Sequence, residues 1–305
     1  MTVPSLECWV PASPKAPFWG QIRALAASLR RYGGEAAARA PLTVVFGPEA
    51  PTEEIARQMA WGEALGVRWE MVPEAIFARH GIYGTALQRF CGRFAADMVL
   101  MLDADVLITG SLDALLRETM ARNVLRGLPT HIPPWADPEQ WDRLFAALEL
   151  GPVPRVCTPS GRGIYPESAL DMPPYFNLGV ILAPAPVMTA IGSILFAEME
   201  AIDAVLATHY RCQLALTAAV CRLGTPWRAL PLRYNFPNDA AFARRHPWER
   251  SQIRILHYLR RGAECDRDRD FASAEALLSW LGRNDLHGVN RLLQRRIQAI
   301  APLRW

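Results

Sequence analysis

The stretch from Met98 to Gly110, MVLMLDADVLITG, constrains the fold of this chain most strongly. Five apolar residues run into Asp103-Ala104-Asp105, and a second apolar run follows and ends at Thr109-Gly110. A continuous apolar run bounded by polar residues is typical of a fully buried strand in a parallel sheet. Open α/β sheets bind ligands at the carboxyl ends of such strands. We therefore expect both acids at the mouth of a buried sheet.

Two carboxylates one residue apart repel each other, and ionising both at a partly buried site is costly. A divalent cation removes this cost, and carboxylate oxygens suit Mn²⁺ or Mg²⁺. The acidic pair therefore predicts a metal site. The alternative is a pair of solvated acids at a strand-to-loop turn, because short acidic motifs also occur by chance.

Strand and helix patterns alternate on both sides of this stretch. Besides the acidic strand, strands are predicted at residues 6–10, 42–46, 67–72, 123–128, 175–183, 227–232 and 253–259. Helices are predicted at 18–32, 52–65, 83–96, 111–120, 141–150, 187–209 and 213–223. This order predicts the α/β class, with a mainly parallel central sheet flanked by helices. A Pro-containing excursion at 129–174 is expected to be a functional loop.

The expected domain organisation is one domain with a tail. Residues 1–272 form the domain, with a nucleotide-binding half at about 1–110 and an acceptor and sugar half at about 111–272. Residues 273–305 form a tail of two helices. Apolar residues at helical spacing favour packing of this tail on the body. Its arginines and tryptophans would also suit weak docking on an anionic membrane.

Composition narrows the class of protein. The formal charge of +3 is too small to indicate a nucleic-acid partner. The six cysteines lack metal-type spacing, and the amino terminus lacks the pattern of a secretion signal. No window approaches the roughly 20 apolar residues of a membrane span. We therefore expect a cytoplasmic protein with reduced thiols.

The order of motifs resembles that of the GT-A glycosyltransferases, which have a single Rossmann-like domain, and most closely their family 8. The resemblance rests on Asp103-x-Asp105, on the strand Phe176-Asn177-Leu178-Gly179-Val180 and on His257, within residues 5–262. It implies a metal-dependent enzyme that moves a sugar from a nucleotide-diphosphate sugar, in this family a UDP-sugar, with retention of configuration. The acceptor is left open as a carbohydrate, a lipid or a protein.

The resemblance also implies roles for individual residues. Asp103, Asp105 and His257 would hold Mn²⁺ or Mg²⁺, and Asp103 would share its oxygens with the ribose. Gln213 and Asn177 are the candidate catalytic residues, with Gln213 orienting the sugar, because an amide is a poor nucleophile. The substrate-binding candidates are Val10, Pro11, Ala12, Ser13, Arg93, Asp103, Ala104, Asp105, Asn177, Gly179 and Gln213.

Several of these residues have a purely structural alternative. His257 would then be a core histidine bonded to a carbonyl, and Arg93 a solvated arginine on a helix. Asn177 would only open its strand, and Ser13 would be an ordinary loop residue. In the functional interpretation, the missing side chain of Gly179 lets a sugar ring approach the backbone.

The sequence departs from the family pattern at two places. His257 is followed by Tyr-Leu-Arg-Arg-Gly instead of a Gly and a Lys-Pro-Trp, so Arg260 or Arg261 would have to supply the positive charge. The family's Asp-Gln pair is Cys212-Gln213 here. This leaves a second function open, a nucleotide-sugar binding protein without turnover. A phosphatase fits less well, because its own Asp-x-Asp usually opens the chain.

Overall fold

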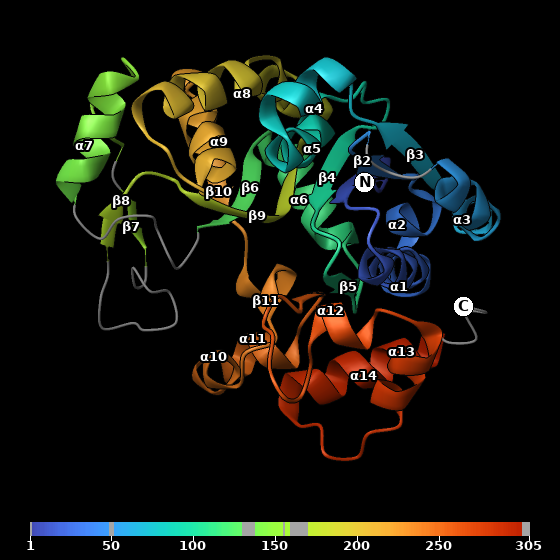
Figure 1. The fold of residues 1–305 in the computed structure, drawn as a ribbon. Coiled ribbons are helices and arrows are strands. Elements are labelled where there is room, and N and C mark those ends of the chain that lie inside the picture. The colour runs from blue at the N-terminus through green and yellow to red at the C-terminus, as the bar shows by residue number, and fades with distance from the viewer. Residues whose placement is uncertain (1, 49–51, 130–137, 155, 159–169, 301–305) are drawn as a thin grey trace.

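A seven-stranded sheet runs through the protein in the order β10-β6-β9-β4-β1-β2-β3 (Figure 1). The structure is a computed structural model that describes residues 2–48, 52–129, 138–154, 156–158 and 170–300. The strands of this sheet are β1 Leu6–Ala12, β2 Leu42–Phe46, β3 Val67–Met71, β4 Met98–Leu102, β6 Leu125–Pro129, β9 Phe176–Pro184 and β10 Trp227–Ala229. The longer helices are α1 Ala16–Tyr32, α3 Thr52–Ala64, α6 Asp113–Arg122, α7 Pro138–Ala147, α8 Ala185–Val205, α9 Arg211–Arg222 and α14 Gly288–Ile300.

Strand pairing confirms the predicted class. β1 pairs in parallel with β2 and β4, while β9 lies antiparallel between β4 and β6. All five residues of β4 are buried, as its continuous apolar run predicts. Alternate residues of β1 point to opposite faces: Cys8 and Val10 pack in the core under α1, and Trp9 packs in the core under α8 and α9. Helices therefore cover both faces of a mainly parallel sheet.

A second, three-stranded sheet extends from the carboxyl edge of the main sheet. It is made of β5 (Val106–Ile108), β11 (Phe236–Pro237) and β12 (Ile255–His257). β12 runs antiparallel to β5, with His257 opposite Val106. The predicted strand at 253–259 thus ends earlier, at His257. This pairing brings a residue near the end of the chain beside the acidic stretch.

The helix predicted at 83–96 is wrong as one continuous helix. The short helix α4 (Glu74–His80) precedes it, and α5 (Ile82–Gln88) and the 3₁₀ helix η1 (Arg89–Cys91) take the place of its first part. Gly92 ends the last of them, and a Cβ there would lie 2.5 Å from the ring of Trp9. Tertiary contact with β1 therefore ends the helical segment before β4 begins.

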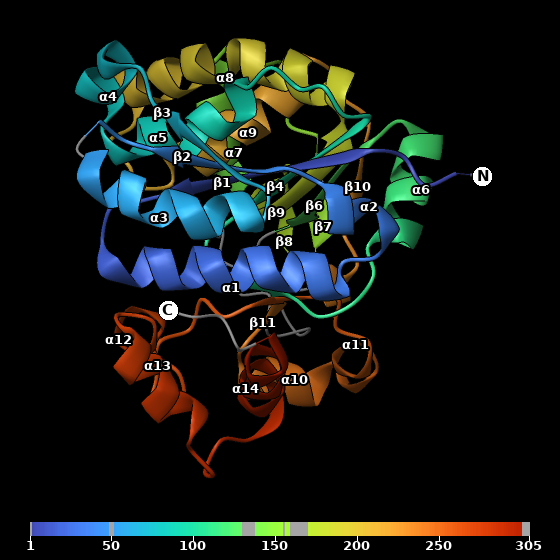
Figure 2. The same ribbon diagram turned by 90° about the vertical axis from the view of Figure 1, so that its right-hand side faces the viewer.

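The C-terminal helices belong to the body of the protein, as Figure 2 shows below α1. α13 (Ala274–Leu281) and α14 follow α12 (Arg267–Asp270). Leu277, Leu293 and Ile297 are fully buried in one core with Leu256 and Tyr258. The apolar spacing of the tail thus reflects packing. Of the remaining elements, α2 covers Glu35–Arg39, η2 Leu232–Tyr234, α10 Ala240–Arg245 and α11 Pro247–Ser251.

One helix is apolar enough to need comment. By length and composition, α8 could cross a membrane, contrary to the expectation from the sequence. Its residues Ile191, Leu195 and Ile202 are fully buried, however, in the core that α9 and β4 also line. Core packing accounts for this face of the helix.

The excursion predicted at 129–174 contains α7 and a small hairpin of β7 (Val156–Thr158) and β8 (Leu170–Met172). Its residues 130–137, 155 and 159–169 lie outside the described residues.

Candidate active site

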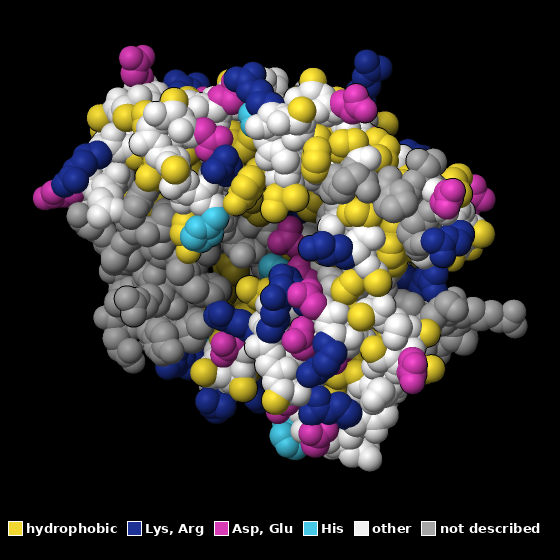
Figure 3. Space-filling view, viewed as in Figure 1, with side chains coloured by type: hydrophobic (Ala, Val, Ile, Leu, Met, Phe, Trp, Pro, Cys, Tyr) yellow, Lys and Arg dark blue, Asp and Glu magenta, His cyan; other side chains and the backbone are white. Residues whose placement is uncertain are grey.

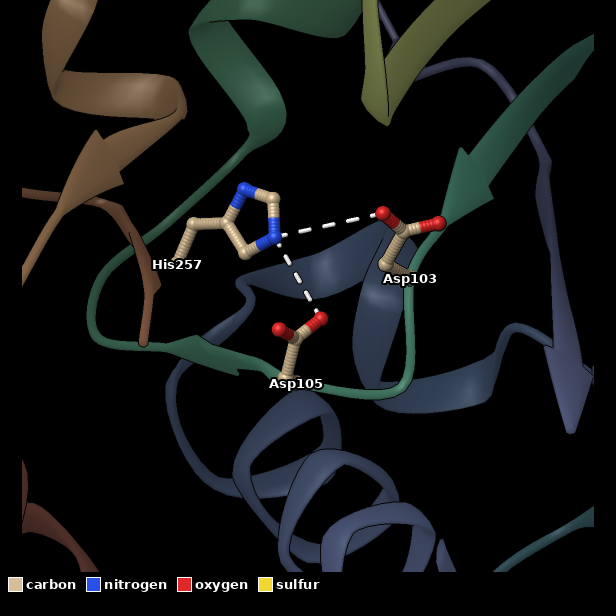
Figure 4. A group of neighbouring side chains, drawn as sticks. All are labelled: Asp103, Asp105 and His257. Atoms are coloured by element: carbon tan, nitrogen blue, oxygen red, sulfur yellow. Dashed lines mark ion pairs between the residues drawn. The ribbon is translucent and has the colours of Figure 1, made fainter. Parts of the chain in front are cut away.

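Asp103, Asp105 and His257 converge at the carboxyl edge of the main sheet (Figure 4). The Nε2 atom of His257 lies 3.3 Å from Oδ1 of Asp105 and 3.9 Å from Oδ2 of Asp103. One ligand atom from each residue lies within 4.8 Å of the other two. The amide of Tyr258 donates a 2.9 Å hydrogen bond to the carbonyl of Asp105, which holds the two segments together.

An amide network orients the imidazole. Oδ1 of Asn177 accepts hydrogen bonds from the amide of Gly179 (2.9 Å) and from Nδ2 of Asn235 (3.0 Å). The other end of the Asn235 amide, Oδ1, therefore faces Nδ1 of His257 at 2.9 Å and accepts its proton. Burial lowers the pKa of His257, so the imidazole is neutral at pH 7. Nε2 then presents a lone pair to the two carboxylates.

This donor set fits a divalent cation. Two carboxylates and a neutral imidazole are ligands that Mn²⁺ accepts, and the Asn235 contact is the outer hydrogen bond that metal-binding histidines usually have. The core-histidine alternative for His257 is therefore incomplete, because its second nitrogen faces acids and not a carbonyl. Asn235 was not predicted as a site residue from the sequence.

Gly179 lies directly against the imidazole of His257. A Cβ at this position would lie 2.7 Å from Nδ1 of His257, closer still to Cε1, and 2.8 Å from Oδ1 of Asn177. Real Cβ contacts do not occur at such distances, so the imidazole fills the space beside the glycine. The missing side chain therefore admits His257, and the approach of a sugar ring at this glycine stays a prediction.

The basic residue beside Asp103 is Arg89. Its Nη1 lies 3.0 Å from Oδ1 of Asp103, and Nη2 donates to the carbonyl of Leu178 at 3.0 Å. Only 1% of the Arg89 side chain is exposed. The predicted Arg93 instead lies after η1 and is exposed, because the expected helix breaks. Both arginines stand in the segment QRFCGR, and only the position of that break distinguishes them.

A cavity of about 430 Å³ lies next to the acids. Figure 3 shows acidic and basic side chains gathered around a hollow at the centre of this face. The side chains that matter for its charge are Lys15, Asp103, Asp105, Arg261, Arg267 and Asp268. Ala104 also lines the cavity.

The predicted segment 10–13 contributes unequally to this cavity. Pro11 lines it, while Val10 and Ala12 are buried and Ser13 is half-buried. Because the Val10 side chain is buried in the core, a ligand could contact only the backbone of this residue.

Arg267 was missed by sequence reasoning. Its Nη1 forms an ion pair with Oδ2 of Asp105. Arg261, one of the two arginines proposed to replace the family's lysine, lines the cavity and pairs with Asp268 at 2.6 Å. The other, Arg260, lies 3.6 Å from Asp239 instead. No sequence pattern near Arg267 predicts its ion pair with Asp105, because the two residues lie far apart in the sequence.

The segment that carries Gln213 has no acid. Gln213 is half-buried in the first turn of α9, and Cys212 before it is buried. Burial raises the pKa of the Cys212 thiol to about 12, so the thiol is uncharged at neutral pH. Its Sγ donates to the carbonyl of Tyr83 at 3.8 Å. The position where the family has an acid is therefore neutral.

Comparison with solved structures shows that the chain has the fold of the GT-A glycosyltransferases, as predicted. It is similar to LgtC carrying an active-site glutamine-to-glutamate mutation, with a TM-score of 0.58 and 17% identity over 97% of this chain and 95% of LgtC. The galactosyltransferase LgtC in complex with donor and acceptor sugar analogues gives 0.54 and 20%, over 93% and 99%.

Mouse xyloside xylosyltransferase 1 in its apo form gives a TM-score of 0.50 and 14% identity, over 84% of this chain and 98% of that protein. No family model and no curated protein matches the sequence.

Proposed function

We propose that the protein is a metal-dependent glycosyltransferase that uses a nucleotide-diphosphate sugar, specifically a UDP-sugar, as donor. The observation that carries this proposal is the convergence of Asp103, Asp105 and His257 beside a charged cavity. The complex of LgtC with donor and acceptor sugar analogues supports it, because the two proteins share a fold.

The reaction breaks the bond between the anomeric carbon and a phosphate oxygen, through an oxocarbenium-like transition state. Asp103, Asp105 and His257 would hold Mn²⁺ or Mg²⁺, which when bound supplies Lewis-acid stabilisation of the departing diphosphate. Lys15 and Arg261 line the same cavity and can bind phosphate oxygens.

Two residues remain candidates for the sugar side of the site. Gln213 is proposed to orient the sugar, and LgtC, with the same fold, has an active-site glutamine. Asn177 has its Oδ1 committed to Gly179 and Asn235, so it positions the imidazole network and offers only its Nδ2 to a sugar. Both assignments keep these side chains out of bond formation.

Calorimetry tests the proposal. UDP-, GDP- and CDP-sugars are titrated into the protein with and without Mn²⁺, and release of the nucleotide is followed in parallel. We expect a UDP-sugar to bind only when Mn²⁺ is present. The Asp105→Asn variant should lose this Mn²⁺-dependent binding. The proposal fails if no nucleotide-sugar binds and none is hydrolysed.

A nucleotide-sugar binding protein without turnover is the second candidate, because Cys212 is neutral where the family has an acid. Under this alternative, UDP binds but no donor releases UDP with any acceptor tested. Cys212→Asp then separates the two functions. Turnover that appears only in this variant supports the binding protein, and turnover in the natural chain excludes it.

We further propose a cytoplasmic location and a weak contact of the tail with anionic membranes. Arg283 pairs with Asp285 and Arg296 lies over the ring of Tyr32, whereas Arg295 is exposed, so only part of the tail's charge is available to lipid. Removing the whole tail would open the core. A chain ending at Ile300, which lacks Arg304 and Trp305 beyond the described residues, is the better comparison in vesicle pelleting at low salt. No pelleting of the full chain would refute the membrane contact, and equal pelleting of the two chains would exclude residues 301–305 from it.

A further inference from the structure

Arg267 lies where a divalent cation would neutralise Asp105. The guanidinium contacts Oδ2 of Asp105, while Oδ1 of the same carboxylate faces His257. The Asp105 side chain is 5% exposed and that of Arg267 is 28% exposed, so the arginine covers the acid from the cavity side. Gln21 donates from Nε2 to the backbone carbonyl of Arg267 at 3.2 Å, which fixes the backbone and leaves the side chain able to turn.

Each acid at the cavity has its own arginine. The pairs are Asp103 with Arg89, Asp105 with Arg267, and Asp268 with Arg261. These arginines compensate the three carboxylates, and Lys15 adds a further positive charge to the same cavity. A dication that enters alone leaves two uncompensated positive charges in a partly buried site, which is unfavourable. A dication that enters with a diphosphate brings its own compensation.

We propose that Arg267 is an internal cation that opposes metal binding until a nucleoside diphosphate arrives, so that metal and nucleotide bind cooperatively. This inference rests on the proposed function and adds a regulation of the same site. Oδ1 of Asp105 faces His257 and can reach an ion there, but the guanidinium on Oδ2 places a positive charge on the same carboxylate and opposes that ion. Because Arg267 also lines the cavity, the phosphate oxygens offer it a second and stronger partner. Arg267 is thus a positioning residue for the metal.

Mn²⁺ binding measured by electron paramagnetic resonance on the full chain tests this, because the signal of free Mn²⁺ disappears on binding. The wild type is compared with Arg267→Gln, with and without UDP. We expect UDP to tighten Mn²⁺ binding to the wild type about tenfold or more, within the usual range of coupling. Arg267→Gln should bind Mn²⁺ about tenfold more tightly than the wild type without UDP and lose most of the coupling.

Two further variants serve as controls. Arg39→Gln removes an exposed arginine of α2 that pairs with Glu35 and does not line the cavity, so its Mn²⁺ affinity without UDP should stay within about threefold of the wild type. Arg267→Lys keeps the positive charge and should retain the coupling. Thermal melting of each variant confirms that it is folded.

The possible outcomes distinguish failure of the role of Arg267 from failure of the proposed metal-dependent function. Equal Mn²⁺ affinity in the wild type and Arg267→Gln, with binding present in both, overturns the role of Arg267 and leaves the metal site intact. Absence of Mn²⁺ binding in both proteins, even with UDP, overturns the metal-dependent function itself.

Discussion

Replacing Gly179 by alanine tests whether the imidazole of His257 is held in place by the missing side chain. The new Cβ would lie 2.7 Å from Nδ1 of His257 and closer still to Cε1. An ordinary contact needs about 3.5 Å, so the ring has to move by roughly 1 Å. Such a shift breaks the 2.9 Å contact with Asn235 and moves Nε2 relative to Asp105.

The size of the effect follows from these contacts. Overpacking of a well-packed site costs about 1–3 kcal/mol, and the lost buried hydrogen bond adds about 1 kcal/mol. We expect the free energy of unfolding to fall by about 2–4 kcal/mol and Tm by about 5 °C or more. Because the ligand is displaced, Mn²⁺ affinity should fall about 10- to 100-fold.

Urea unfolding and Mn²⁺ titration by electron paramagnetic resonance measure the two quantities. Gly282→Ala is the matched control, because its Cβ would meet only ordinary 3.5 Å contacts and its φ is negative. In the His257→Ala background the Gly179→Ala substitution should cost less stability, since the clashing ring is gone. Wild-type Mn²⁺ affinity in the single Gly179→Ala variant would refute this account of the site.

Three other perturbations give specific expectations. Arg89→Gln removes a buried guanidinium from Asp103 and from the carbonyl of Leu178, so it should reduce the free energy of unfolding by about 3–5 kcal/mol in urea titrations. The exposed Arg93→Gln is the control and should change this free energy by less than about 0.5 kcal/mol. Gly192→Ala places a Cβ against the carbonyl of Phe90, so it should lower Tm by several degrees in calorimetry, and an unchanged Tm would contradict the close approach of α8 and η1. Hydrogen bonds from Ser5 lower the pKa of Asp97, so their stabilisation is present above the unfolded pKa of about 4 and disappears as the pH falls through the folded value. The stability difference between wild type and Ser5→Ala should therefore be largest near pH 7 and shrink below about pH 4 in urea unfolding; a difference independent of pH would argue against it.

Local sequence patterns were enough to predict the short buried strands of the main sheet. The strand at 42–46 and the acidic strand at 98–102 have the predicted bounds, because a short apolar run between polar residues fits few other structures. The acidic pair was predicted from its own strand. His257 joined it only through the resemblance to family 8, because it was expected inside a strand at 253–259.

Long-range packing determined the parts that the sequence did not predict. The helix expected at 83–96 breaks because Gly92 packs on Trp9, a contact that no periodicity within the helix encodes. As a result the arginine beside Asp103 is Arg89 and not Arg93. The apolar periodicity of the tail was visible, but the core that it completes is formed by β12 and the helices after it.

The arginines of the site show why ligands and their charge partners differ in predictability. A carboxylate ligand is short, so its position follows from the backbone of its own strand. A guanidinium stands on a long side chain and can reach an acid from any neighbouring element, as Arg267 on α12 reaches Asp105. Its presence is nevertheless required by electrostatics, because Asp105 is buried and a buried carboxylate needs a cation. A paired acidic motif at a strand end therefore predicts that a cation will be found there, and the structure places Arg267 of this chain on Oδ2 of Asp105.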